Sequence, residues 1–458
     1  SGRRVWLFGT ARGLDRLAAL GFRGAFVLAV AGPLFWIAVP VLHKADPLWV
    51  EDRASLAGLI GAALACLGAA LALAAVMVPA SANAEYVVIG VFVPTTGALA
   101  PLGEDMRNGY ELAAKDATVK GNPVRLVVED SAGKVDIGLR KAQKLVLEDK
   151  AKLLVGGASS AVVLGINAQA ARLNVPILTT NSQAVQTTGE QCSRYLFRTN
   201  PNDAMMAKAN AIMMQERPEF LEKKWFVVFH DFVWGQSNKG EFAKIPGINI
   251  VGEAGRPLGT ADWSSAISQI QSSGADAVYL ALAVGDDMPA FIRQARSFGV
   301  DAFMLPPLGM PDSMLQAVGE DAVGMVTGGL FGSWMSEETN PAMKTFVEAY
   351  VAAYGEVPGP QAIQAYAGMQ IALAAMEAAE TLDTDGIIAA LETTSVDSVI
   401  GPLQIRKEDH QGMVGTFMSE SVLLPDAPHG AKIGWKVLKE IPWDDVKVEL
   451  ADTGCAGL

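Results

Sequence analysis

The sequence is poor in the side chains on which enzyme catalysis and metal binding most often depend. Its 458 residues include only four histidines and three cysteines, and charged residues make up 19% of the chain. Beyond residue 84 the histidines are His230, His410 and His429, which lie in three separate regions. Because no two of them have the spacing of ligands on one helix, the sequence predicts no metal site.

Motifs that carry nucleophile or cofactor chemistry are also missing. There is no HExxH, CxxC, GxSxG or GxxxxGK[ST] motif, and no GxGxxG follows an expected strand. The adjacent acids Asp286–Asp287 and Asp444–Asp445 have the pattern of solvated carboxylates rather than of an acid–base pair. We therefore predict that the protein is not an enzyme and needs no cofactor.

Positive charge is in short supply as well. Lysine and arginine number 36 against 49 aspartates and glutamates, and beyond residue 84 the counts are 29 and 45. An acidic chain repels phosphate backbones and anionic lipid surfaces, so a nucleic-acid partner is not expected.

The apolar residues are concentrated near the N-terminus. Runs at 24–42 and 56–78 follow a series of arginines, and the second run ends in PASANA, where cleavage after Ala84 would suit a signal peptidase. We predict that residues 1–84 are an apolar leader. An uncleaved membrane anchor is the alternative, because the second run is longer than a usual signal-peptide core.

Only two cysteines, Cys192 and Cys455, remain after this leader. Export would place both in an oxidising compartment, where thiols of one chain are often paired. We hypothesise a disulfide between them, which would tie the C-terminal tail to the first half of the protein.

From residue 86 onward, short β-branched runs alternate with amphipathic helical stretches. This alternation predicts parallel sheets covered by helices on both faces. A first series has strands at 86–93, 124–130, 152–157 and 175–180, and a second has strands at 223–230, 248–254, 275–282 and 302–307. An irregular stretch, 181–203, separates them, and Asp203 is expected to cap the helix that follows.

Two such series predict an α/β fold of two doubly wound parallel-sheet lobes joined by crossovers, with a ligand cleft at the strand ends. Helical stretches at 341–355 and 360–380 have the character of first-lobe helices. We therefore assign residues 85–204 plus 338–395 to lobe 1, and 205–337 plus 396–458 to lobe 2.

Polar side chains follow two neighbouring strands of the first series. Gly156-Gly157 ends one strand, and a helix starts at Ser159 and Ser160, where free N–H groups and hydroxyls suit a carboxylate. Ordinary capping by serine is the alternative. Asn181, Ser182 and Gln183 follow the next strand and would face the same cleft edge.

Tryptophans and aspartates are the candidate ligand-binding residues on the opposite side of the expected cleft. Trp234 is expected in the loop after strand 223–230, and Trp334 follows a later strand, so that either ring could cover a ligand. Each could equally be a core residue between the lobes. Asp286, with Asp287, could accept hydrogen bonds from a ligand ammonium, although helix-start acids are commonly solvated.

Taken together, five segments strongly resemble the branched-chain amino acid-binding family of periplasmic proteins, whose type I two-lobed fold serves ABC importers. They are IGVFVPTTGALAPLGEDMRNGYELA, LLVGGASSAVVLGINAQAARLNVPILTT, HDFVWGQS, ADWSSAISQIQSSGADAVYLALAVGDD and KEDHQG. The resemblance implies that Ser159, Ser160 and the backbone of 181–183 hold a ligand carboxylate beneath the ring of Trp234. It also implies a disulfide like Cys192–Cys455, a hinge closure and a periplasmic location.

Two departures from the family bear on the ligand. Leu102 stands where amino-acid-binding members often present a tyrosine, and 305–312 lacks the acid that some members use for an α-ammonium. The expected ligand is therefore a branched-chain amino acid or a related aliphatic or aromatic acid. The expected partner of the monomeric protein is an importer permease, and a ligand-sensing receptor ectodomain on the same fold is the alternative.

Overall fold

The computed structural model describes residues 86–283, 285–329, 340–424 and 432–458. The chain divides into two compact units, residues 1–83 and 84–458, and the expected leader lies outside the described residues. No helix in these four described ranges is long and apolar enough to cross a membrane.

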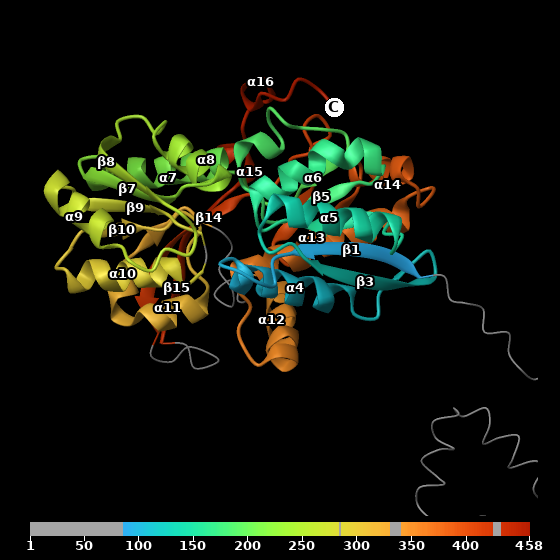
Figure 1. Cartoon of the computed structure of the whole chain (residues 1–458), viewed down its shortest axis with the longest axis horizontal. Coiled ribbons are helices and arrows are strands. Elements are labelled where there is room, and N and C mark those ends of the chain that lie inside the picture. The colour runs from blue at the N-terminus through green and yellow to red at the C-terminus, as the bar shows by residue number, and fades with distance from the viewer. Residues whose placement is uncertain (1–85, 284, 330–339, 425–431) are drawn as a thin grey trace, which may run out of the picture. The chain divides into compact units, whose positions relative to one another are not determined.

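The first sheet has six strands in the order β2-β3-β1-β4-β5-β6. Figure 1 labels β1, β3 and β5 of this sheet. Apart from the short β2 at one edge, neighbouring strands are parallel. The strands are β1 (Val87–Val93), β2 (Thr118–Val119), β3 (Asn122–Asp130), β4 (Leu153–Gly156), β5 (Ile177–Thr179) and β6 (Leu196–Arg198). All seven residues of β1 are buried, as expected for a parallel strand with helices on both faces.

The side chains of β1 alternate between two apolar layers. Ile89 and Val91 join the core that includes Met106 of α4 (Ala100–Ala114). Val88 and Phe92 pack instead with residues of α5 (Val135–Leu147) and α6 (Ser160–Leu173). A strand period of two therefore divides the helices between the two faces of the sheet.

The second sheet has four parallel strands in the order β10-β9-β7-β8. Its strands are β7 (Lys224–His230), β8 (Asn249–Arg256), β9 (Ala277–Ala281) and β10 (Phe303–Leu305). The helices of this part are α7 (Asp203–Glu216), α8 (Val233–Phe242), α9 (Ser264–Ser273), α10 (Asp287–Ser297) and α11 (Asp312–Val318). The predicted α/β fold with two parallel sheets is confirmed.

The C-terminal third of the chain returns to both sheets. Helix α12 (Pro341–Tyr354) and helix α13 (Pro360–Ala378) pack on α4, and α14 (Thr384–Leu391) packs on α13. Strands β11 (Val326–Thr327), β14 (Thr416–Leu423) and β15 (Ile433–Ile441) form an antiparallel sheet. The remaining elements are the hairpin β12 (Ser395–Ser398) and β13 (Gly401–Gln404), and the short helices α15 (Trp443–Val446) and α16 (Leu450–Thr453).

Three local predictions were wrong. The irregular stretch 181–203 contains β6 and a short 3-10 helix, η2 (Val185–Thr187). Trp234 lies in the first turn of α8 rather than in a loop. Asn202, not Asp203, caps α7, because its side-chain oxygen accepts the N–H of Met205 while the Asp203 carboxylate is engaged by α8.

Candidate ligand site

The order of the strands predicts a crevice at one end of each main sheet. In the first sheet β1 pairs with β3 on one side and with β4 on the other, and in the second sheet β7 stands between β8 and β9. Successive crossovers leave such central strands in opposite directions, so their connecting loops part and leave a crevice at the carboxyl ends. The loops after β4, β5, β7 and β9 are therefore the natural place for a ligand.

The first of these loops carries Ser159 and Ser160, which are both buried. Ser159 occupies the N-cap position of α6, but its side chain makes no capping hydrogen bond. Ser160 Oγ accepts the backbone N–H of Ala184 at 3.4 Å and so contacts the loop after β5. Simple capping by Ser159 is thus not what the structure shows, and its hydroxyl stays available to a ligand.

The glycines before these serines allow the close approach of strand and helix. Gly157 has a φ of +90°, and a Cβ there would lie 2.2 Å from Cγ2 of Val163 and 3.0 Å from Oγ1 of Thr179. Only glycine avoids both the strained backbone and the overlap. The predicted turn at the end of β4 therefore depends on this residue.

The loop after β5 is polar and completely buried over Asn181–Gln183. Asn181 donates to Gln364 Oε1 at 3.4 Å, and the hydroxyls of Ser182 and Thr187 are 2.8 Å apart. The side-chain nitrogen of Gln183 has no hydrogen-bond partner within the described residues. A buried donor without a partner is costly, so this amide is suited to bind an acceptor that enters the crevice.

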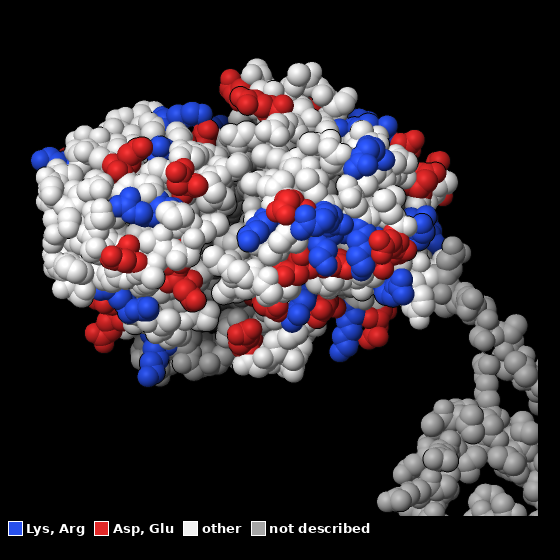
Figure 2. All heavy atoms as spheres, in the orientation of Figure 1, with Lys and Arg blue, Asp and Glu red and all other residues white. Residues whose placement is uncertain are grey.

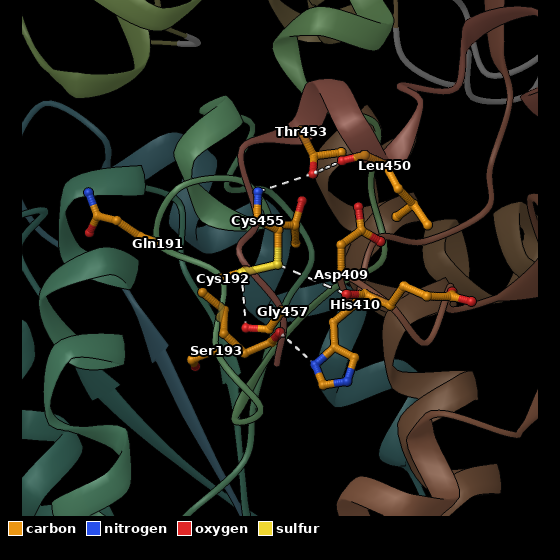
Figure 3. Close-up of a disulfide and its surroundings, with 12 residues drawn as sticks. Gln191, Cys192, Ser193, Asp409, His410, Leu450, Thr453, Cys455 and Gly457 are labelled. Carbon is orange, nitrogen blue, oxygen red and sulfur yellow. Dashed lines mark hydrogen bonds between the residues drawn. A yellow bond between two sulfur atoms is a disulfide. The ribbon is translucent and has the colours of Figure 1, made fainter.

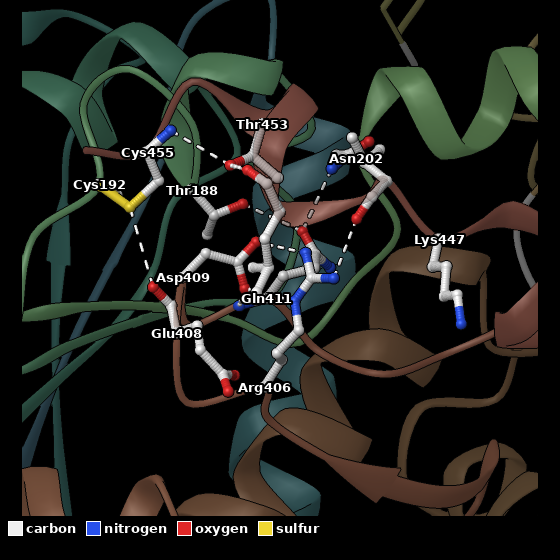
Figure 4. Close-up of polar contacts among 12 residues, drawn as sticks. Thr188, Cys192, Asn202, Arg406, Glu408, Asp409, Gln411, Lys447, Thr453 and Cys455 are labelled. Carbon is white, nitrogen blue, oxygen red and sulfur yellow. Dashed lines mark hydrogen bonds and ion pairs between the residues drawn. A yellow bond between two sulfur atoms is a disulfide. The ribbon is translucent and has the colours of Figure 1, made fainter. Parts of the chain in front are cut away.

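A buried arginine, which sequence reasoning missed, holds this loop in place. Arg198 at the end of β6 donates to the backbone oxygens of Ser182 (3.2 Å) and Ala184 (2.8 Å) and to Gln411 Oε1 (2.8 Å). Thr188 and Asn202 donate to the same oxygen of Gln411 (Figure 4). Burial lowers the pKa of Arg198 to about 9, because the charged form has lost its water.

Trp234 contributes the aromatic ring on the side of the second sheet. Its indole nitrogen donates to Asp203 Oδ1 at 3.0 Å. The ring belongs to a small apolar cluster that joins the loop before α4 to the second sheet, formed by Leu99, Met206, Trp234, Ala283 and Leu308. Apolar contact area therefore lies beside the polar strand ends, as a ligand with a carboxylate and an apolar body would require.

The structure does not place the other predicted ligand-binding residues beside these polar loops. Leu102 is buried on α4 within the main core and is not part of the small apolar cluster around Trp234. Asp286 precedes α10 and is exposed, whereas Asp287 is held 2.9 Å from Nε2 of His230, which together with other hydrogen bonds lowers its pKa. Trp334 and His429 lie outside the described residues.

His410 is a packing residue in the described part of the chain. It is buried and stacks on Phe197, with ring centroids 3.7 Å apart, and burial lowers the pKa of its imidazole. No group of metal-ligating side chains is found within the described ranges.

A pocket of about 440 Å³ is bordered by the continuation of the loop after β5 (Val185, Gln186 and Thr188), by α7, by the C-terminal end of α8 and by the tail of the chain. Its lining includes Lys208, Glu241, Lys244 and Asp452. None of the predicted ligand-binding residues lines it.

The predicted disulfide between Cys192 and Cys455 is present, and it joins residues 263 positions apart (Figure 3). Cys455 lies in the tail after α16, and its sulfur is 3.9 Å from the backbone oxygen of Glu408. The tail is thereby fixed beside the crossover that carries His410 and Gln411.

Two parallel sheets covered by helices, with buried polar loops after β4 and β5 of the first sheet and a tryptophan and an apolar cluster beside the second, are the architecture of a two-lobed solute-binding protein. The sequence matches the family model for periplasmic binding proteins over residues 86–422. The chain therefore belongs to the periplasmic binding protein family, and the resemblance to its branched-chain amino acid-binding members is confirmed.

Individual relatives agree with this assignment. The chain is 28% identical over 348 residues to the Leu/Ile/Val-binding protein homolog 8 of Brucella suis, a match that covers 72% of this chain and 86% of that protein. A periplasmic binding protein from Burkholderia mallei superposes with a TM-score of 0.74 at 27% identity, covering 81% of this chain and 99% of the other. A Rhodopseudomonas palustris solute-binding protein in complex with 3,4-dihydroxybenzoic acid gives 0.69 at 22% identity, covering 78% and 97%.

Proposed function

We propose that this protein captures a small carboxylate-bearing solute in the periplasm and delivers it to an ABC importer. In this proposal the lobes comprise residues 85–204 plus 338–395 and 205–337 plus 396–458. They open to admit the solute and close to bury it. Residues 1–84 serve as the export leader.

The observation that carries the proposal is the pair of buried polar strand ends. Ser159, Ser160 and Gln183 come from two neighbouring loops, and Ser160 is hydrogen-bonded to the second loop. Hydroxyls, a free amide nitrogen and the N–H groups of the first turn of α6 are donors of the kind that bind a carboxylate. On this basis we assign the carboxylate to Ser159, Ser160, Asn181, Ser182 and Gln183, and the covering ring to Trp234. The assignment of Leu102, Asp286 and Trp334 to the rest of the ligand rests on the sequence alone.

The class of ligand follows from the apolar neighbours of Trp234 and from the relatives. A Leu/Ile/Val-binding homolog and solute-binding proteins in complex with 3,4-dihydroxybenzoic acid and benzoate are among the similar proteins. We therefore propose a branched-chain amino acid or an aliphatic or aromatic acid.

A thermal-shift screen of the purified protein against leucine, isoleucine, valine, short aliphatic acids and benzoates tests this proposal. A ligand at about a hundred times its dissociation constant adds roughly 2.7 kcal/mol to the stability of the folded state. The expected result is a rise in melting temperature with one class of acid, reduced in Ser160→Ala. If no acid raises the melting temperature, the proposed ligand class is wrong.

The role in transport needs a separate experiment. Cells that lack this protein should lose uptake of the radiolabelled acid and regain it when the gene is restored. Unchanged uptake, together with tight binding in the purified protein, would favour the alternative of a ligand-sensing ectodomain.

A further inference from the structure

Three side chains of α8 converge on a single buried carboxylate. The indole nitrogen of Trp234 and the amide of Asn238 donate to Oδ1 of Asp203 at 3.0 and 2.9 Å, and the hydroxyl of Ser237 donates to Oδ2 at 2.6 Å. Positions 234, 237 and 238 have the i, i+3, i+4 spacing that places side chains on one face of a helix. Asp203 therefore fixes the rotation of α8 as well as the ring of Trp234.

Asp203 is also connected to the loop after β5. Its backbone N–H donates to the backbone oxygen of Gln183 at 2.9 Å. Ser237, one of its α8 partners, accepts the backbone N–H of Val185 at 3.2 Å. One residue thus contacts both the polar loop of the first sheet and the helix that presents the aromatic ring.

Helix capping does not explain this carboxylate. Asn202 supplies the capping oxygen of α7, and Asp203 itself is 1% exposed. A carboxylate that has been removed from water is costly unless its hydrogen bonds compensate. The three side-chain donors to this carboxylate all come from α8. Their hydrogen bonds therefore stabilise the contact between α7 and α8.

We propose that Asp203 is a positioning residue of the ligand site, which holds the Trp234 ring over the polar loop 181–183 and joins α8 to that loop when the lobes are closed. This inference rests on the proposed function, because it assigns Trp234 to ligand binding. A ligand would be bound tightly only when the ring and the loop are held in register by this contact.

Two titratable groups act on Asp203 directly, and a third acts through Arg198. Arg198 of β6 stabilises the ionised form of Asp203, Tyr279 of β9 interacts with it, and Asp409 of the crossover acts on Arg198. Burial outweighs the hydrogen bonds and Arg198, and raises the pKa of Asp203 to about 7. The indole of Trp234 should therefore report protonation of this carboxylate near neutral pH.

The first test is the 1H–15N spectrum of the tryptophan indole groups, with the Trp234 signal assigned through Trp234→Phe. In the wild type this signal should lie downfield and move with a midpoint near pH 7. Asp203→Asn, which keeps an oxygen for the indole, should retain the downfield position and lose the pH dependence. Asp203→Ala should shift the signal upfield.

Asp105→Asn is the matched control, because Asp105 is another aspartate with a pKa raised by burial but lies between α4 and α13. It should leave the Trp234 signal and its titration unchanged. A Trp234 signal in Asp203→Ala identical to that of the wild type would refute the positioning role.

The second test is calorimetric titration with the acid from the screen that gives the largest thermal shift. Asp203→Ala should weaken binding at least tenfold and Asp203→Asn less than threefold, with Asp105→Asn unchanged. Equal affinity of wild type and Asp203→Ala would overturn the inference while the proposed function stands. If the wild type binds none of the acids, the proposed function fails, and the indole signal alone decides whether Asp203 positions Trp234.

Discussion

Nε of Arg198 donates to Oε1 of Gln411 at 2.8 Å, and so joins the last strand of the first sheet to a crossover 213 residues later in the chain. Gln411 in turn donates to the backbone oxygens of Asn200 (2.9 Å) and Gly412 (3.0 Å). The contact lies directly behind the loop that carries Ser182 and Gln183. Loss of this hydrogen bond is therefore expected to weaken both the folded state and ligand binding.

Replacement of Gln411 by alanine should lower the free energy of unfolding by about 2–4 kcal/mol, because it leaves several buried groups without a partner. Urea denaturation measures the loss. Gln271→Ala is the control, since this glutamine is exposed and donates only to the backbone oxygen of Phe298. The control should change stability by less than about 0.5 kcal/mol. Similar values for both variants would show that the buried network contributes little.

Removal of the disulfide should destabilise the protein while leaving its fold intact. Cys192→Ser with Cys455→Ser opens a link across 263 residues, and the expected loss is about 2–5 kcal/mol in the unfolding free energy. Denaturation of wild type with and without reductant should give the same difference. The double variant, which has neither thiol, should not respond to reductant. Intact mass of the native protein showing two free thiols would contradict the bond itself.

Asp105 should make stability depend on pH in a direction opposite to that of most carboxylates. Burial raises its pKa from 3.8 to about 6, despite hydrogen bonds from Ala362, Gly359 and Tyr350. The folded state then binds more protons than the unfolded state between these values, so stability from this group falls as pH rises from about 4 to 6 and is constant above.

The measurement is the difference in unfolding free energy between wild type and Asp105→Asn at several pH values. Carboxylates with lowered pKa, such as Glu129 and Asp130, contribute equally to both proteins and cancel. As pH rises from about 4 to 6, the unfolding free energy of the wild type should fall by about 1–3 kcal/mol relative to that of Asp105→Asn. A difference that is constant with pH would show that folding does not raise the pKa of Asp105.

Gly157→Ala should disrupt the turn before α6. The new Cβ would meet Val163 at 2.2 Å in a backbone with φ of +90°, which together cost about 2–4 kcal/mol. Gly240→Ala is the matched control, because Gly240 lies within α8 and a Cβ there meets nothing within 4 Å. The control should stabilise by about 0.5–1 kcal/mol. Thermal unfolding of both variants separates the two effects, and a neutral Gly157→Ala would argue against the tight turn.

No single-sign charged patch stands out on the face of the molecule drawn in Figure 2. Lysines, arginines, aspartates and glutamates are interspersed over the face shown in Figure 2.

Much of the fold was predictable because each element carries its own pattern. The continuous apolar run of β1 and the amphipathic helices on either side indicate a parallel sheet, and the structure has it. The start of α6 at Ser160 was readable from Gly156-Gly157 and the serines that follow. Strand β6 could not be predicted, because its three residues lie in a polar, turn-rich segment and form a strand through pairing with β5 and a bridge from Arg198 to Gln411.

Of the candidate site, the sequence by itself determined that Ser159, Ser160 and Gln183 follow neighbouring strands, and it led to the hypothesis of a disulfide because only two cysteines follow the leader. Tertiary structure decided which polar groups find one another. Asp203 was predicted to cap a helix, yet Asn202 caps α7 and Asp203 accepts three hydrogen bonds from α8, and Arg198 meets Gln411 across 213 residues. Local patterns report which face of an element is buried, whereas the partner of a buried polar group depends on how distant elements pack, which no spacing along the chain records.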